Sequence, residues 1–215
     1  MDELLRRVDP SSGRYVLGIA GPPGAGKSTI ATAVAAAAAA RRGTGFAAVA
    51  PMDGFHRSNE DLDAHGLLAV KGAPETFDVA ALVERLRDVR VLPGETVHWP
   101  GFDRGREQTV RDAIAILPTT RLVVVEGNYL LLDKPHWREL RPLLDETWYV
   151  DAPLLVLRTR LLERARAGGR SETEAIAHVD GSDLRNARLV AATKTIADRQ
   201  LAGAAPTDAR WRRGD

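Results

Sequence analysis

The sequence predicts an α/β protein in which helices cover both faces of a mostly parallel sheet. Short apolar runs alternate with segments of helical periodicity, and several of these runs are apolar on both faces. No internal repeat or long linker divides the 215 residues. Alternating strands and helices imply βαβ units, which place parallel strands between two helical layers. We therefore expect one three-layer α/β/α domain over residues 1–215.

The composition is that of a globular protein, with 44% hydrophobic and 27% charged residues. The net charge is +1, which argues against a large nucleic-acid surface. Cysteine is absent, so disulfides and cysteine-bound zinc are excluded, and the five histidines have no metal-ligand spacing. No apolar run approaches the ~20 residues of a membrane span, and the N-terminus lacks the apolar core of a signal peptide. We expect a soluble cytoplasmic protein without nucleic-acid or membrane partners.

The first half of the chain contains two predicted strands and two predicted helices. "YVLGIA" is apolar throughout, as in a strand buried on both faces. Helix formers follow, including six consecutive alanines, and end before a glycine that suits a C-cap. Asp78 can cap a later helix that has an apolar stripe. These elements are strand 15–20, helix 27–42, strand 46–50 and helix 79–90.

The second half repeats this alternation. "RLVVVEG" is the clearest strand in the chain, and "TWYVDA" is another. Pro153 suits the first turn of the helix that follows, and Gly168-Gly169 ends that helix. The predicted elements are a short strand 96–99, strands 121–127 and 147–152, a helix from Pro153 to about Arg166, and a helix over 183–193.

Residues 21–28, "GPPGAGKS", match the phosphate-binding pattern G-x-x-x-x-G-K-[ST] between a predicted strand and a predicted helix. The glycines let backbone N–H groups converge on phosphate oxygens, which the positive end of the helix also favours. Because motif and context agree, a glycine-rich turn that only starts a helix is the weaker interpretation. The predicted nucleotide-binding residues here are Gly21, Gly24, Ala25, Gly26, Lys27, Ser28 and Thr29.

Particular side chains of this motif have expected partners. Lys27 is expected to reach the β- and γ-phosphates, and Ser28 to ligate Mg²⁺. Glu126 ends the clearest strand, where a carboxylate of such a sheet lies near the metal. A solvated glutamate is the alternative. We therefore predict a metal site at Ser28 and Glu126.

Asp53 follows the second predicted strand in the stretch "PMDGFHR". The carboxyl ends of parallel strands open onto one edge of the sheet, so Asp53 is expected near the γ-phosphate. A carboxylate there can accept the proton of an attacking hydroxyl, or can hold a magnesium water. We expect Gly54 to let the chain pass close to the substrate.

Five stretches together resemble one enzyme group. They are "GPPGAGKST", "MDGF", "KGAPETFD" (71–78), "VVVEGNYLLL" (123–132) and "YVDAP" (149–153). The chain resembles the P-loop kinases grouped as phosphoribulokinase, uridine kinase and type I pantothenate kinase, over residues 15–198. Its "DGF" followed by "KGAPETFD" is more similar to pantothenate kinase than to uridine kinase. It also resembles short bacterial chains described as nucleoside or fructose kinases, and it is shorter than type I pantothenate kinases.

The resemblance implies a P-loop NTPase fold with a small helical lid, and roles for particular residues. Asp53 is the implied catalytic base, and Glu126 helps to bind magnesium and substrate. Arg160, with Arg164 one turn later, is the implied contact of the transferring phosphate. Two arginines four residues apart share a helix face and repel unless an anion lies between them. Gly168-Gly169 allows a hinge, so we expect a mobile lid over about 158–175.

The acceptor pocket is expected beside Asp53 and at "HWPGFDR" (98–104), where the related kinases carry a proline-aromatic-polar signature. Each candidate also has an ordinary surface or core explanation. Residues 178–189, "HVDGSDLRNARL", resemble a feature of bacterial relatives and are expected near the nucleotide or the lid. The acceptor candidates are Phe55, His56, Arg57, His98, Asp103, Arg104 and Tyr129.

The sequence therefore predicts an ATP- and Mg²⁺-dependent kinase that phosphorylates a hydroxyl of a small metabolite, with Asp53, Lys27 and Arg160 as catalytic residues. The acceptor is left open between a pantothenate-like compound, a nucleoside and a sugar. A P-loop ATPase or a regulatory nucleotide-binding module is the alternative function. A GTPase is disfavoured because no N-K-x-D motif is present. A homodimer is left open.

Overall fold

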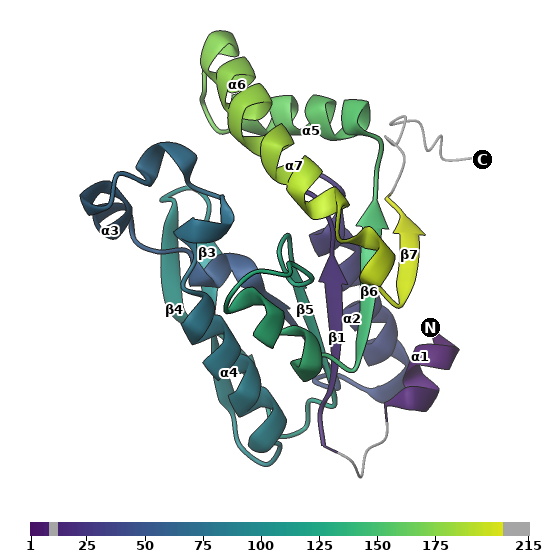
Figure 1. Cartoon of the computed structure of the whole chain (residues 1–215). Helices are drawn as coiled ribbons and strands as arrows, with labels where there is room; N and C mark the ends of the chain where they lie inside the picture. The colour runs from purple at the N-terminus through teal and green to yellow at the C-terminus, as the bar shows by residue number, and fades with distance from the viewer. Residues whose placement is uncertain (9–12, 204–215) are drawn as a thin grey trace, which may run out of the picture.

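The computed structural model describes residues 1–8 and 13–203. The parts of the predicted domain at 9–12 and 204–215 therefore lie outside the described residues. A five-stranded sheet forms the centre, in the order β2-β5-β1-β6-β7 (Figure 1). All its neighbouring strands pair in parallel. The strands are β1 (Tyr15–Ala20), β2 (Ala47–Pro51), β5 (Leu122–Gly127), β6 (Glu146–Asp151) and β7 (Arg199–Ala202).

Side chains of the sheet alternate between two apolar clusters, one on each face. Val123 and Val125 pack with α4 (Val79–Val91) and the segment after β5, whereas Leu122 and Val124 pack with α2 (Lys27–Arg42) and α5 (Leu154–Ala167). The short helix α1 (Asp2–Arg7) adds Leu4 and Leu5 to the second cluster. The predicted three-layer α/β/α fold is therefore confirmed.

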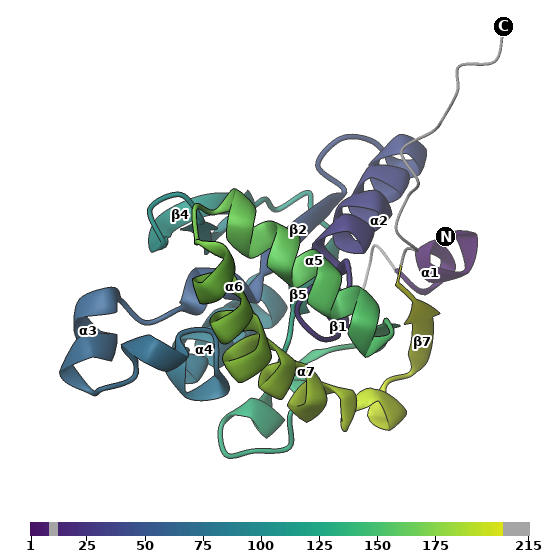
Figure 2. The ribbon, with the colours of Figure 1, turned by 90° about the horizontal axis from the view of Figure 1, so that it is seen from above.

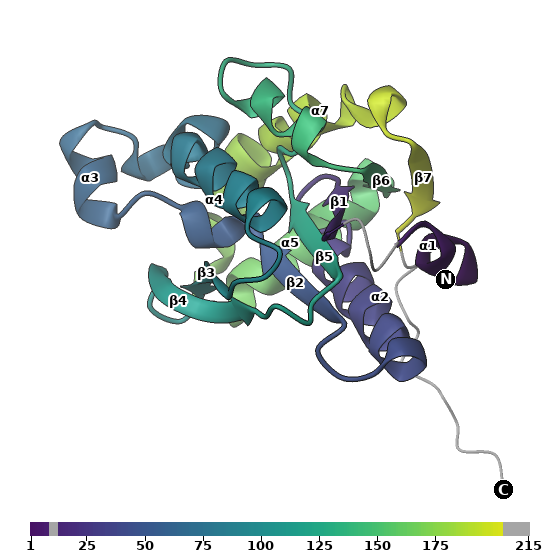
Figure 3. The ribbon, with the colours of Figure 1, turned by 90° about the horizontal axis from the view of Figure 1, so that it is seen from below.

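A separate antiparallel hairpin lies beside the β2 edge of the sheet (Figure 3). Its strands are β3 (Val97–Asp103) and β4 (Gln108–Ile116). The pairing shifts between Trp99 and Gly101, at Pro100, which cannot donate to a strand ladder. The indole N–H of Trp99 donates to the carbonyl of Pro51 at 2.9 Å, which ties the hairpin to the end of β2. The prediction of a strand at 96–99 was too short, and β4 was not predicted.

The helices that follow β6 cover the carboxyl ends of the strands. After α5, a turn at Gly168-Gly169 leads into α6 (Glu172–His178), a π-helical turn (Val179–Asp183) and α7 (Leu184–Ala191). Seen from above, α6 and α7 form one rod that runs beside α5 from the turn that joins α5 to α6 (Figure 2). The predicted helix end and the break lie where expected, with Pro153 immediately before the helix. Leu161, Leu162 and Ala165 are buried, so the C-terminal half of α5 is part of the core.

The segment between β2 and α4 consists of short elements. They include a 3₁₀ turn (Met52–Phe55) directly after β2 and α3 (Asn59–Ala64). His56 forms an antiparallel bridge with Phe77, so this segment closes on itself as a compact lobe next to the hairpin. Within residues 1–8 and 13–203, no helix is both long enough and apolar enough to cross a membrane.

Candidate active site

The phosphate-binding loop connects β1 to α2, and its last glycine begins the helix. Gly26 has φ +97°, a left-handed conformation that side chains disfavour. Lys27 is the first residue of α2 and is only 8% exposed. Its Nζ donates to the carbonyl of Pro22 at 3.0 Å and to Oδ1 of Asn128 at 2.7 Å. Burial lowers the pKa of Lys27, while the carboxylates of Glu126 and Asp53 oppose this shift.

Ser28 and Glu126 meet at the mouth of this loop. The hydroxyl of Ser28 donates to Oε1 of Glu126 at 2.8 Å, and Glu126 is 7% exposed. Burial raises the pKa of Glu126, and the charge of Lys27 opposes it. The exposed hydroxyl of Ser28 beside the buried carboxylate suits a hard cation, whose other ligands would be phosphate oxygens and water. Within the described parts of the chain, no three His, Asp or Glu side chains form a metal centre by themselves.

Asp53 lies one strand further along the same edge. β2 ends at Pro51, which pairs with Glu126 of β5, and the 3₁₀ turn then carries Asp53. Met52 anchors this turn against Gly127, where an added Cβ would lie 2.5 Å from the Met52 side chain. A guanidinium nitrogen of Arg104, from the hairpin, donates to Oδ2 of Asp53 at 2.5 Å.

The structure brings these groups into one cleft of about 840 Å³. Its walls come from the phosphate loop, the ends of β2 and β5, the hairpin turn and the α5–α6 corner. Most of the residues that the sequence predicted for the nucleotide, the metal and the base lie together here, namely Gly24, Gly26, Lys27, Ser28, Thr29, Asp53, Glu126 and Arg164. The predicted Gly21 and Ala25 are buried within the loop and do not line the cleft.

The two predicted arginines of α5 have different positions. Arg160 donates to the carbonyl of Gly24 at 3.1 Å, so it connects α5 to the phosphate loop. Arg164 lies one turn later and lines the cleft with Leu161 and Ala165. The predicted shared face therefore directs both arginines toward the phosphate loop.

Two of the predicted acceptor residues line the cleft, His56 and Arg104. The His56 ring lies 4.0 Å from that of Phe77 and 4.7 Å from that of Phe102, between centroids, and its Nδ1 is 2.8 Å from the Asp53 carbonyl. Burial lowers the pKa of His56, and the charge of Asp53 opposes this shift.

The other acceptor candidates lie outside the cleft. Phe55 is buried edge-to-face on Trp99, with ring centroids 5.0 Å apart. Tyr129 is 1% exposed and donates its hydroxyl to the carbonyl of Gly72 at 2.6 Å. Asp103 accepts the N–H groups of Gly105 and Arg106 in the hairpin turn, and His98 is exposed on β3. Apolar burial accounts for Phe55 and Tyr129, and turn capping accounts for Asp103.

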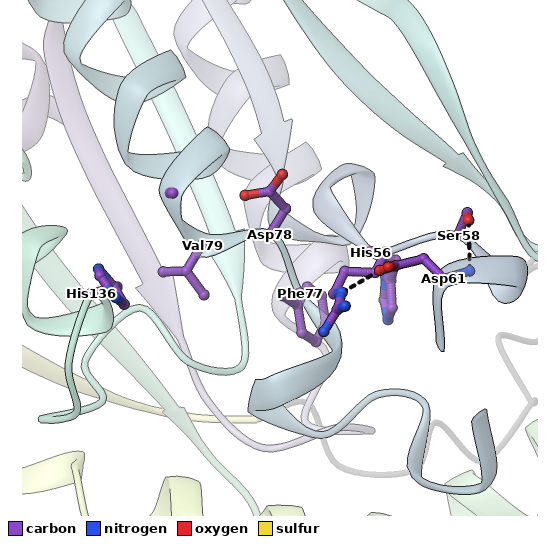
Figure 4. Close-up of a pocket in the computed structure, with 9 residues that line it drawn as sticks. His56, Ser58, Asp61, Phe77, Asp78, Val79 and His136 are labelled. Atoms are coloured by element: carbon purple, nitrogen blue, oxygen red, sulfur yellow. Dashed lines mark hydrogen bonds and ion pairs between the residues drawn. The ribbon is translucent and has the colours of Figure 1, made fainter. Parts of the chain in front are cut away.

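Arg57 and Gly54 also differ from expectation. Arg57 is ion-paired with Asp61 at a second, shallower hollow of about 530 Å³, where His56 and Phe77 form the wall shared with the cleft (Figure 4). His136 lies at the other side of that hollow. A Cβ on Gly54 would lie 2.1 Å from the carbonyl oxygen of Pro100. Gly54 therefore admits the hairpin backbone, and the expectation that it admits a substrate was wrong.

Sequence reasoning missed several residues of the cleft. Asn128 follows directly after the predicted strand end, and its contact with Lys27 could have been expected from that position. The others come from distant segments that only the folded chain brings together, and they are Asn59, Lys71, Phe102, Glu107 and Arg170. The segment 178–189, which was expected near the nucleotide or the lid, does line the cleft, through His178, Asp183 and Asn186.

Comparison with known proteins found close relatives. No family model matches the chain. The Escherichia coli protein YggC, whose name assigns no activity, is 44% identical over 183 residues, which cover 84% of this chain and 75% of that protein. A Schizosaccharomyces pombe protein named as a candidate uridine kinase is 36% identical over 183 residues, or 82% of this chain and 78% of its own length.

A solved structure is equally similar. The crystal structure of a candidate fructose transport system kinase from Silicibacter sp. TM1040 has a TM-score of 0.85 and 39% identity, covering 93% of this chain and 96% of that one. The Saccharomyces cerevisiae P-loop protein YFH7 has a TM-score of 0.77 at 17% identity and covers 95% of this chain and 97% of its own, so it supports the fold alone.

Proposed function

The chain belongs to the P-loop kinases related to uridine kinase and pantothenate kinase, and on this premise we propose that it transfers the γ-phosphoryl group of ATP to a hydroxyl of a small metabolite. The relatives carry names that point to uridine, pantothenate and fructose, which are all hydroxyl compounds. The observation that carries the proposal is the position of Asp53 in the same cleft as Lys27, Ser28 and Glu126.

The phosphate side of the cleft binds the nucleotide in this proposal. The backbone of the glycine loop and Lys27 hold the phosphates, and the ammonium of Lys27 exchanges Asn128 for phosphate oxygens. Ser28 and Glu126 would hold Mg²⁺, which would neutralise phosphate charge when it is bound. Arg160 fixes α5 on the loop, and Arg164 faces the phosphates from the next turn of the same helix.

Asp53 acts on the acceptor. The acceptor oxygen attacks the γ-phosphorus, the bond to the β–γ bridging oxygen breaks, ADP leaves, and the hydroxyl proton passes to Asp53. Arg104 holds the carboxylate in place through its 2.5 Å hydrogen bond. The α5–α6 corner (about 158–175) covers the cleft and excludes water, which limits hydrolysis of ATP.

An ATPase or regulatory module without an acceptor is the second candidate, because the phosphate side alone would serve it. Release of ADP measured with and without pantothenate, nucleosides and sugars separates the two. A kinase releases ADP in proportion to the phosphorylated acceptor, whereas an ATPase releases ADP and inorganic phosphate without any acceptor.

Substitution Asp53→Asn tests the proposed base. We expect kcat to fall by about 10²- to 10⁴-fold, the range of general-base catalysis, with little change in the Kd for ATP. Asp61→Asn is the matched control, because Asp61 pairs with Arg57 outside the cleft. Turnover by Asp53→Asn close to that of the control would exclude Asp53 as the base.

A further inference from the structure

The cationic side chains of the cleft divide into two groups. Lys27, Arg164 and Arg170 come from the phosphate loop and the α5–α6 corner, where a triphosphate would lie. Lys71 and Arg104 come from the lobe and the hairpin beyond Asp53. Along the sheet edge the order is the phosphate loop after β1, then Glu126, then Asp53 after β2, and then the hairpin. The second group therefore lies on the acceptor side.

The burial and the contacts of Lys71 suit a group that binds an anion. Its side chain is 13% exposed, and Nζ donates to Oδ1 of Asn59 at 2.7 Å and to the carbonyl of Glu107 at 2.8 Å. Both of these acceptors are neutral. Lys71 also forms an ion pair with Glu107, at 3.6 Å, and the Glu107 side chain is 56% exposed. The ammonium also lies over the ring of Phe102, 5.3 Å from its centroid. A largely buried ammonium whose hydrogen-bond partners are neutral, and whose one ion pair is long and solvent-exposed, favours an incoming anion.

The backbone beside Lys71 is anchored by two other elements. The carbonyl of Gly72 accepts the hydroxyl of Tyr129 at 2.6 Å and the amide of Asn186 at 3.4 Å. Tyr129 follows β5, and Asn186 belongs to α7 in the segment 178–189. The N–H of Gly72 donates to the hydroxyl of Thr76 at 3.0 Å. The strands and the α6–α7 rod thus fix the position of Lys71, and Tyr129 and Asn186 are positioning residues.

Arg104 offers a second cationic group. One of its nitrogens binds Asp53, yet its side chain is 61% exposed. A guanidinium has five N–H donors in one plane and can bind two anions at once. Arg104 can therefore contact an acceptor while it remains paired with Asp53, so that the acceptor hydroxyl is placed beside the base.

We propose that Lys71 and Arg104 bind an anionic group of the acceptor, which is therefore a hydroxylated carboxylate or phosphate ester instead of a neutral nucleoside or free sugar. This inference rests on the proposed kinase function. Carboxylate and phosphate oxygens share the chemistry that these two cations recognise, and the acceptors tested below separate them.

Three pairs of acceptors that differ in charge test the inference. They are pantothenate and its alcohol panthenol, fructose 6-phosphate and fructose, and uridine 5′-monophosphate and uridine. Transfer of label from γ-³²P-ATP is measured for each. We expect the charged member of one pair to exceed its neutral partner in kcat/KM by about 100-fold, because hydrogen bonds between charged groups are strong. Preference for pantothenate identifies a carboxylate, and preference for either phosphate ester identifies a phosphate.

The outcomes that contradict the inference and the function are different. Equal or better phosphorylation of a neutral member would overturn the anionic acceptor and leave the kinase function intact. Binding of MgATP with no transfer to any of the six compounds would overturn the proposed function, and the inference with it.

Variant Lys71→Met provides the second test, with exposed Lys134→Met as the matched control. We expect the KM of the charged acceptor to rise about 10- to 100-fold, with unchanged KM values for ATP and for the neutral partner. Lys71→Arg should restore much of the preference. An equal loss for charged and neutral acceptors would show a merely structural role. Arg104→Gln should show the same collapse of the charged-to-neutral ratio, and this keeps the test decisive if Lys71→Met does not fold.

Discussion

The two sides of the cleft are constructed in different ways. The phosphate side consists of one continuous loop at the start of a helix, together with the end of the neighbouring strand, and Lys27 and Glu126 are both buried. The acceptor side is assembled from the lobe after β2, the hairpin and α7, and its cations remain partly exposed. In the proposed function, one side binds a ligand common to many enzymes, whereas the other side must distinguish this protein from its relatives.

This difference predicts that the acceptor side can be damaged while the phosphate side continues to bind nucleotide. The two sides meet at Asp53, in the 3₁₀ turn after β2, and at Glu126, on the adjacent strand β5. Beyond that contact, the hairpin is tied to the sheet by local contacts at Pro51 and Gly54. Substitutions in the lobe therefore test how separate the two sides are.

Gly54→Ala should have the largest effect on the acceptor side. The new methyl group would lie 2.1 Å from the Pro100 carbonyl oxygen, so the hairpin must move away from the 3₁₀ turn. We expect a loss of about 3 kcal/mol in the free energy of unfolding. The KM of the acceptor should rise by more than about tenfold, since a misplaced contact is costly. Urea unfolding and steady-state kinetics measure both quantities.

The control for this substitution is Gly94→Ala, where an added Cβ meets no atom within 4 Å. If Gly54→Ala weakens binding of ATP as much as binding of the acceptor, the two sides are not independent.

Tyr129→Phe should have an intermediate effect. It removes the 2.6 Å hydrogen bond to the Gly72 carbonyl and leaves only the longer bond from Asn186. We expect a cost of about 1 kcal/mol in stability and a rise of about threefold in the acceptor KM, because Lys71 is less firmly held. Thermal unfolding and acceptor kinetics provide the measurement.

Tyr149→Phe is a matched control for this change. The Tyr149 hydroxyl is buried and has no hydrogen-bond partner within the described residues, so its removal should be neutral or stabilising. A larger loss of stability for Tyr149→Phe than for Tyr129→Phe would contradict the assigned hydrogen bonds.

The smallest effect expected is a pH dependence from His56. Burial lowers the pKa of His56 below its ordinary value of 6.5, although Asp53 opposes the shift and Lys71 and Arg104 reinforce it. As the pH falls, His56 in the unfolded chain therefore binds a proton before His56 in the folded protein does. The folded protein keeps its full free energy of unfolding above the ordinary pKa and loses part of it below that value. Between about pH 7.5 and about pH 5.5, the wild type should lose more unfolding free energy than His56→Gln. An identical loss in both proteins would exclude this contribution.

The parts of the fold that sequence predicts are those with strong local patterns. β5 is apolar at four consecutive positions, and α2 begins at a recognisable motif. β4 and β7 lack such patterns. Most of β4 is exposed, so no alternation of buried residues marks it. β7 is attached to the sheet by distant contacts, including those of Asp198 with the N–H and hydroxyl of Thr147, each at 2.7 Å.

The candidate site also contains residues that the sequence predicts and residues that it does not. The positions of Lys27, Ser28, Asp53 and Glu126 follow from strand ends in a parallel sheet, which is a rule of topology. Phe55 and Tyr129 were predicted as acceptor residues because they lie beside such strand ends, yet both side chains are buried in the core. Lys71 was missed because its partners are distant in the sequence, and no local pattern reports such contacts. Asn186 was expected near the site only as part of 178–189, because its contact with Gly72 is equally distant.

The π-helical turn between α6 and α7 already holds one residue more than an α-helical turn. Because the extra residue is accommodated within the turn, α6 and α7 remain one rod, and His178 and Asn186 on its two sides both line the cleft. Deleting one residue within Val179–Asp183 would give an ordinary α-helical turn and would leave the relative rotation of the two helices nearly unchanged. Inserting a further residue would rotate one helix relative to the other by about 100° and would move either His178 or Asn186 out of the cleft. This segment should therefore tolerate the loss of one residue and resist the gain of one.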